Sequence, residues 1–123
     1  MIHKLRKHTI SLRNALNGVI FCLRTQPNFQ IHIFFSTLAL AAGLFLNISY
    51  YEFFMIIFLI TTGLVIETIN TAIEQATDAI DTRWREDIGH AKDIAAGAML
   101  IFAVGASVIS GIIFIPKIVV LFN

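Results

Sequence analysis

Three long apolar runs, separated by short polar segments, fill most of this chain after its first 28 residues. Each run holds about 20 residues, which is enough for a helix to cross the hydrocarbon core of a bilayer. The chain has 123 residues, 57% of them hydrophobic and 14% charged. A soluble domain of this size has too little interior to bury so much apolar surface. We therefore predict an all-α integral membrane protein, with transmembrane helices at residues 29–48, 53–80 and 88–115.

The first 28 residues are basic and amphipathic. Apolar residues recur there at helical spacing, at Leu5, Leu12, Leu16, Val19, Ile20 and Leu23. A cationic amphipathic helix of this kind lies in the headgroup plane. We predict a surface helix at residues 1–28, within a single membrane domain of residues 1–123. Its cations either anchor the chain only or also contribute to a phosphate site. Pro27 is expected to break this helix or bend it into the next.

Lysine and arginine gather in the N-terminal segment and in the loop at residues 81–92, whereas the turn at residues 47–52 has none. The positive-inside rule then predicts a cytoplasmic N-terminus and second loop, and an outside C-terminus. We expect Asp87 to cap the third membrane helix and Pro116 to mark its far end. His32 is expected to hydrogen-bond at the interface, because no second ligand stands at metal-binding spacing.

A polar stripe interrupts the second span as it leaves the apolar zone. The segment reads E-T-I-N-T-A-I-E-Q-A-T-D over residues 67–78. At about 100° per residue its polar members fall within an arc of roughly 100°. They are Glu67, Asn70, Thr71, Glu74 and Asp78. A carboxylate at the bilayer centre costs about 3 kcal/mol on insertion scales, so such residues indicate function. Asp78 alone is compatible with a solvated helix end, but Glu67 has apolar neighbours.

Carboxylates beside lysine and arginine suit a divalent metal that carries a nucleotide, because magnesium prefers oxygen ligands and retains waters. The third span starts on the same side, so its N-terminal amides and Lys92 would attract phosphate. These patterns leave two classes open. One is a membrane enzyme that acts on a lipid and a phosphate donor. The other is an ion- or proton-coupled transporter with Glu67 as the coupling carboxylate, for which more spans or a repeat are expected. A structural assembly factor leaves the stripe unexplained.

Two motifs carry a resemblance to a known family. E-x-x-N-T-A-I-E-x-x-x-D at residues 67–78 and A-K-D-x-A-A-G-A at residues 91–98 resemble the signature of prokaryotic diacylglycerol kinases and undecaprenol kinases. The likeness extends to N-F-x-I-H at residues 28–32 and to Gly18, and it covers residues 7–115. It implies a homotrimer in the bacterial cytoplasmic (inner) membrane, with active sites that are shared between subunits. It also implies that the protein uses Mg²⁺ as cofactor and ATP as co-substrate, and that it does not bind nucleic acid.

The activity that this resemblance implies is phosphorylation of a membrane lipid alcohol. Diacylglycerol, converted to phosphatidic acid, is the first acceptor, and undecaprenol, converted to undecaprenyl phosphate, is the alternative. The N-F-x-I-H and A-A-G-A forms favour the undecaprenol kinase branch.

Residue by residue, the resemblance implies that Glu67 is the catalytic base for the lipid hydroxyl, with Asn70 beside it. A carboxylate held away from water is a competent base, which agrees with this role. The resemblance makes Glu74 and Gln26 metal ligands, with Asp78 in support. The implied lipid contacts are Lys7, Glu67 and Ala96. The implied nucleotide contacts are Lys7, Asn14, Gln26, Glu74, Arg83, Trp84, Arg85, Lys92 and Asp93.

Two positions depart from the family pattern. Gln26 stands where members commonly have glutamate, so it brings no charge to the metal and a weaker affinity is expected. The loop at residues 83–85 differs from the usual acidic-aromatic-histidine pattern. Trp84 retains an aromatic ring there, which either covers the adenine or anchors the chain at the membrane interface.

Overall fold

The computed structural model describes the backbone of residues 2–81, 83 and 85–122, and the side chains within these ranges from residue 11 onward. Its regular structure consists of four helices, α1 (Ile2–Thr25), α2 (Pro27–Phe45), α3 (Tyr50–Ile80) and α4 (Glu86–Leu121). The described ranges contain no strand. The predicted all-helical class is therefore confirmed.

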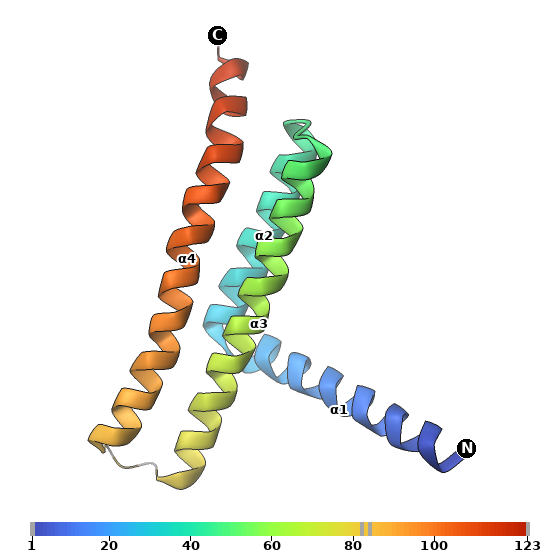
Figure 1. The fold of residues 1–123 in the computed structure, drawn as a ribbon, viewed down its shortest axis with the longest axis vertical. Helices are drawn as coiled ribbons and strands as arrows, with labels where there is room; N and C mark the ends of the chain where they lie inside the picture. The colour runs from blue at the N-terminus through green and yellow to red at the C-terminus, as the bar shows by residue number, and fades with distance from the viewer. Residues whose placement is uncertain (1, 82, 84, 123) are drawn as a thin grey trace.

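Three of the helices run side by side, and α1 leaves them at a steep angle (Figure 1). These three helices, α2, α3 and α4, are each long and apolar enough to cross a membrane, as predicted. α3 has 31 residues and α4 has 36, so they measure about 46 and 54 Å, well beyond the roughly 30 Å of the hydrocarbon core. Their shared end projects past the level at which α1 meets α2 (Figure 1). This projecting hairpin carries the charged residues of the α3–α4 connection, such as Asp81, Arg85 and Asp87.

The boundaries of α2 and α3 follow from local chemistry. Pro27 is the first residue of α2, a position at which its missing N–H leaves no hydrogen bond unmade. The turn after α2 contains Asn47 with φ 48°, a left-handed conformation that asparagine tolerates. Ser49 then caps α3. Its backbone N–H donates to the Glu52 carboxylate at 2.6 Å, and its hydroxyl accepts from the Glu52 N–H at 3.3 Å.

α3 is the central helix, and it packs against each of the other three. Few hydrophobic side chains are buried among those described, and they are Cys22, Phe29, Ile56, Ala95 and Ile113. Large apolar side chains instead cover the outside of the helices, as at Ile101, which is 77% exposed. This is the surface expected of helices that face lipid or other copies of the chain.

Two predictions about α4 were wrong. The helix begins at Glu86 with Arg85 in the N-cap position, because the Asp87 carboxylate pairs with the Arg85 guanidinium at 2.6 Å. Pro116 lies inside α4, which continues to Leu121; membrane helices tolerate internal proline because neighbouring groups satisfy the freed carbonyl. Near that end the Lys117 ammonium lies 3.6 Å from the Glu52 carboxylate, which joins α4 to the start of α3.

Candidate active site

The first three members of the polar stripe of α3 are buried, although they are a carboxylate, an amide and a hydroxyl group. Glu67 is 2% exposed, Asn70 6% and Thr71 3%. The Asn70 amide donates to the Glu74 carboxylate at 3.2 Å, one helical turn further along. The spacing that places these residues on one face of α3 thus turns that face into the bundle. Glu67, Asn70 and Thr71 are part of the interior, whereas Glu74 is half-buried and Asp78 is exposed.

Glu67, Asn70 and Glu74 line a cavity of about 270 Å³ between the three spans, which we call the carboxylate pocket. α2 and α4 supply its other walls. The residues from these two helices are Asn28, Ile31, His32, Ala96, Met99, Leu100 and Ala103. Ala96, an implied lipid contact, is therefore placed in the same pocket as Glu67. The pocket combines acidic and amide groups on α3 with a mainly apolar wall on α4.

Three buried polar atoms in the stripe have no hydrogen-bond partner among the described residues. They are one carboxylate oxygen of Glu67, the side-chain carbonyl oxygen of Asn70 and the hydroxyl of Thr71. By contrast, the nearby Thr77 hydroxyl makes 2.9 Å contacts to the carbonyls of Ile73 and Glu74. Leaving such a group unpaired costs about 1–3 kcal/mol, so native proteins rarely do so without a reason. A ligand in the carboxylate pocket with donors or positive charge would satisfy the oxygens of Glu67 and Asn70, which line it.

Beyond the pocket, an ion pair joins the polar ends of α3 and α4. The Lys92 ammonium donates to the Asp78 carboxylate at 2.5 Å. Both side chains are partly exposed. Lys92 is located two turns into α4, so its charge adds to that of the helix N-terminus. The Lys92 ammonium therefore places a positive charge on α4 one helical turn before Ala96, which lines the carboxylate pocket.

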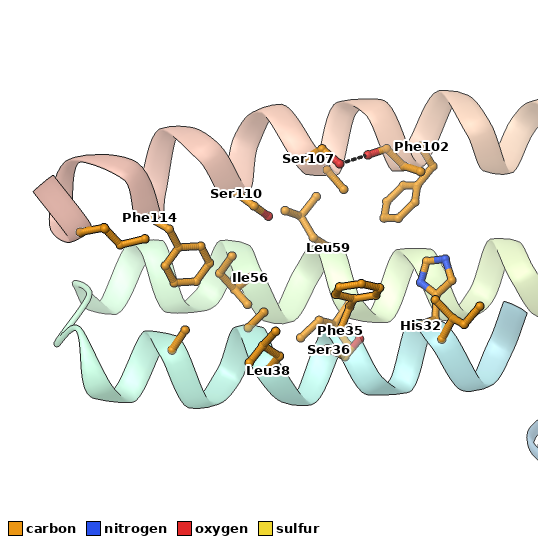
Figure 2. A pocket seen from close by; sticks show the side chains of 17 residues that line it. His32, Phe35, Ser36, Leu38, Ile56, Leu59, Phe102, Ser107, Ser110 and Phe114 are labelled. Carbon is orange, nitrogen blue, oxygen red and sulfur yellow. Dashed lines mark hydrogen bonds between the residues drawn. The ribbon is translucent and has the colours of Figure 1, made fainter.

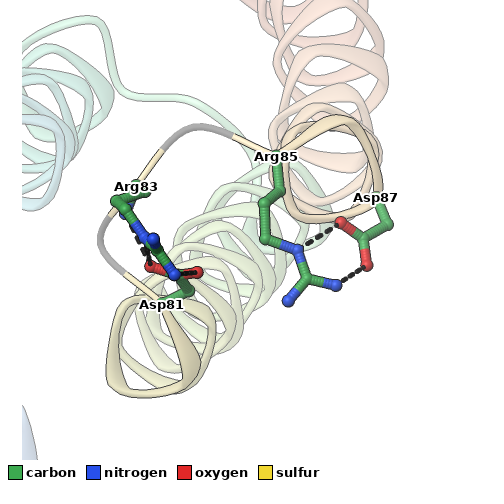
Figure 3. Close-up of polar contacts among 4 residues, drawn as sticks. All are labelled: Asp81, Arg83, Arg85 and Asp87. Atoms are coloured by element: carbon green, nitrogen blue, oxygen red, sulfur yellow. Dashed lines mark hydrogen bonds and ion pairs between the residues drawn. The ribbon is translucent and has the colours of Figure 1, made fainter.

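The connection between α3 and α4 holds two charged pairs (Figure 3). The Arg83 guanidinium and backbone N–H donate to Asp81 at 2.9–3.2 Å. These hydrogen bonds hold the pKa of Asp81 below its ordinary value, and those from the Arg83 side chain have the largest effect. Arg85 pairs with Asp87 through two hydrogen bonds at 2.6 and 3.1 Å, which raise the pKa of Arg85. Both arginine side chains are exposed.

Several implied site residues are not brought into the carboxylate pocket by this chain. Gln26 precedes α2, and its amide donates to the Thr25 hydroxyl at 3.3 Å. Asn14 and Asp93 are exposed on α1 and α4. The side chain of Lys7 and all of Trp84 lie outside the described residues.

His32 is the residue whose place sequence reasoning missed. We expected it at the membrane interface, but it is half-buried and lines the carboxylate pocket opposite α3. The signal was present in the spacing. Asn28 and His32 are four residues apart, so they share one face of a helix, and both line the pocket.

The donor set fits a magnesium ion that is shared with a substrate. The described residues contain no group of three or more histidine, cysteine, aspartate or glutamate side chains that could hold a metal alone. Magnesium needs only one or two carboxylates when phosphate oxygens and waters complete its shell. Glu74 and the unpaired carbonyl oxygen of Asn70 provide such oxygens in the pocket.

Three candidate spans around a buried acidic pocket define a multi-pass membrane protein with a polar site between its helices. The chain belongs to the prokaryotic diacylglycerol kinase family, whose model matches residues 13–114. It is 37% identical to the undecaprenol kinase of Bacillus subtilis (strain 168) over 116 residues, which cover 94% of each chain. It is also 31% identical to the diacylglycerol kinase of Synechocystis over 108 residues. That second match covers 87% of this chain and 62% of the relative.

Membership of this family settles the class of protein. The chain is a lipid kinase that uses ATP, and the transporter interpretation that the residue patterns left open is set aside.

Proposed function

We propose that this chain transfers the γ-phosphate of ATP to the hydroxyl of a membrane lipid alcohol at the carboxylate pocket. The observation that carries the proposal is Glu67, a carboxylate with a buried, unpartnered oxygen between three membrane helices. A base for an alcohol must lie beside apolar space, so that the lipid can present its hydroxyl without leaving the membrane. The pocket meets this condition, because Met99 and Leu100 line it together with Glu67.

Undecaprenol is our first candidate for the acceptor. Two facts favour it over diacylglycerol, which we first expected. The undecaprenol kinase of B. subtilis is the more similar of the two relatives, and the match covers 94% of both chains. The diacylglycerol kinase of Synechocystis extends well beyond the match, which covers 62% of it. Diacylglycerol remains the second candidate, since it too presents a primary hydroxyl at the interface.

In the proposed reaction, Glu67 accepts the proton of the lipid hydroxyl as that oxygen attacks the γ-phosphorus in line with the leaving ADP oxygen. Asn70 holds the Glu74 carboxylate by the 3.2 Å hydrogen bond, so that Glu74 is oriented toward the pocket as a metal ligand. A bound magnesium ion would neutralise charge on the transferring phosphoryl group. Lys92 turns from Asp78 to the phosphates, which a partly exposed side chain can do at little cost.

We further propose that the active unit is a homotrimer in the bacterial cytoplasmic membrane, with the N-terminus inside and the C-terminus outside. The basic residues of α1 and of the α3–α4 connection support this orientation. The exposed apolar face of α4, with Leu100, Ile101 and Val104, supports assembly with other copies. Gln26, Asn14 and Lys7 would then act at a site completed by a neighbouring subunit. Light scattering of the purified protein tests the trimer by its mass.

The test of the function is a parallel assay. Purified protein in mixed micelles receives ATP labelled at the γ-phosphate, with undecaprenol in one reaction and diacylglycerol in another. Labelled lipid in either reaction supports the proposal, and the ratio of kcat/KM values identifies the acceptor. Helical, assembled protein that labels neither lipid would contradict it.

A further inference from the structure

A second, larger cavity adjoins the carboxylate pocket. It has a volume of about 620 Å³ and is lined by residues of α2, α3 and α4 (Figure 2). Its lining is mainly apolar and includes Phe35, Leu59 and Phe114. Ile31, His32 and Ala103 line both this cavity and the carboxylate pocket. The two spaces are therefore neighbours along the bundle, one acidic and one apolar.

One residue from each span comes together beside the boundary between the two spaces, where His32 lines both of them and Phe102 lines the apolar cavity. Gly63 of α3 lies one helical turn before Glu67 and is buried. A Cβ atom at Gly63 would lie 2.6 Å from the Phe102 ring and 3.3 Å from the His32 ring. The missing side chain of Gly63 thus lets both rings approach the α3 backbone. Figure 2 shows His32 and Phe102 at one end of the cavity and Phe114 at the other. We call Gly63, His32 and Phe102 the throat.

We propose that the apolar cavity receives a single hydrocarbon chain of the lipid alcohol, and that the throat limits the width of the chain that can enter it. The proposal rests on the proposed function, because it takes the hydroxyl to lie at Glu67. From there the chain must leave through apolar space, and the cavity that shares three lining residues with the pocket provides it.

The size of the cavity supports one chain over two. If a chain carbon takes about the volume of a liquid water molecule, ~30 Å³, the cavity of 620 Å³ holds on the order of 20 carbons. That is one fatty acyl chain or the first few isoprene units of a polyprenol. A narrow, single-chain lipid therefore suits this site better than a lipid whose two chains branch next to the hydroxyl.

The narrowing variant is Gly63→Ala. Its methyl group, 2.6 Å from the present position of the Phe102 ring, would push that ring into the throat. The assay compares kcat/KM for undecaprenol with kcat/KM for 3-methylbut-2-en-1-ol, a prenyl alcohol of one isoprene unit that the carboxylate pocket of about 270 Å³ alone can hold. We expect the undecaprenol value to fall at least tenfold more than the value for the short alcohol. The matched control is Gly105→Ala, because an added Cβ there meets no atom within 4 Å.

A widening variant tests the same throat in the other direction. Phe102→Leu removes the ring and is expected to raise kcat/KM for diacylglycerol relative to undecaprenol at least threefold. Combined with Gly63→Ala, it should restore the undecaprenol value toward that of the wild type, because the smaller side chain leaves room for the new methyl group. This rescue would not be expected if Gly63→Ala merely loosened the bundle.

Distinct results overturn the inference. Equal losses with undecaprenol and 3-methylbut-2-en-1-ol in Gly63→Ala, or an unchanged lipid preference in Phe102→Leu, would show that the throat does not select the chain. Loss of both activities in Gly63→Ala that Phe102→Leu does not restore would show that Gly63 serves only the packing of the bundle. If wild-type protein labels neither alcohol, the proposed function itself fails.

Discussion

The Lys92 ammonium contacts the Asp78 carboxylate at 2.5 Å, and this pair connects the polar ends of α3 and α4. We predict that Lys92→Gln raises KM for ATP about tenfold or more, since a hydrogen bond to a charged group contributes about 1.5–3 kcal/mol. Steady-state kinetics with varied ATP checks this result. The matched control is Lys117→Gln, which removes a lysine paired with Glu52 near the opposite end of α4.

Measuring the stability of Lys92→Gln distinguishes a role of Lys92 in ATP binding from a role in holding the fold together. The two side chains of the pair are 36% and 48% exposed, and exposed ion pairs contribute about 0–1 kcal/mol. Lys92→Gln should therefore unfold at nearly the wild-type denaturant concentration. The same KM for ATP in both lysine variants would remove Lys92 from the nucleotide site.

Glu74 is predicted to act through magnesium. Glu74→Ala removes a carboxylate that the Asn70 amide now holds at 3.2 Å. We expect the magnesium concentration for half-maximal activity to rise about tenfold, because few protein ligands hold such an ion and each contributes strongly. Titration of activity with MgCl₂ at fixed ATP gives the measurement. Glu86→Ala, an exposed glutamate in the first turn of α4, is the control. Superimposable titrations for the two variants would argue against coordination by Glu74.

The capping box at the start of α3 allows a prediction about stability alone. Ser49→Ala removes the hydroxyl that accepts the Glu52 N–H at 3.3 Å. Loss of such a cap costs about 0.5–2 kcal/mol in free energy of unfolding. Activity should remain at the wild-type level, since Ser49 precedes the first residue of α3, whereas Glu67 and Glu74 lie in the second half of that helix. Denaturant titration in detergent and the lipid assay measure the two effects. A large loss of activity without loss of stability would contradict this separation.

The pKa of Asp81 is lowered mainly because the Arg83 side chain donates hydrogen bonds to its carboxylate. The hydrogen bond from the Arg83 backbone N–H lowers it further. Since the folded pKa is depressed, this contact stabilises the connection above the ordinary pKa and is lost as the pH falls through the lowered value. Arg83→Ala should raise the pKa of Asp81 toward its ordinary value. NMR titration of the carboxyl carbon detects the change. Arg85→Ala should have a smaller effect, because Arg85 acts on Asp81 only through its charge.

Much of this architecture could be predicted because the deciding patterns are local. The apolar runs predicted three spans, and the spacing from Glu67 to Glu74 placed their side chains on one face of α3. What local pattern cannot give is which helix faces which. His32 joined the pocket because α2 packs beside α3, and Gly63 matters because Phe102 of α4 lies against it. Both facts depend on tertiary packing.

The errors have physical causes as well. Asp87 is a good N-cap residue by type, but its carboxylate pairs with Arg85, and the helix starts at Glu86. Pro116 would end a helix in water, whereas α4 runs through it. The shared sites of a trimer depend on contacts between chains, so the roles of Lys7, Asn14 and Gln26 stay predictions.

The central claim is that Glu67 accepts the proton of a lipid alcohol. The most direct measurement is the kcat of Glu67→Gln with undecaprenol and γ-labelled ATP, beside Glu86→Gln as the exposed control. Glutamine keeps the size and hydrogen-bonding capacity of the side chain but cannot take up a proton at neutral pH. General base catalysis contributes about 10²–10⁴-fold, so we predict a loss of kcat of that order in Glu67→Gln alone, with the assembly unchanged. A kcat within about threefold of wild type, well short of that range, would contradict the account.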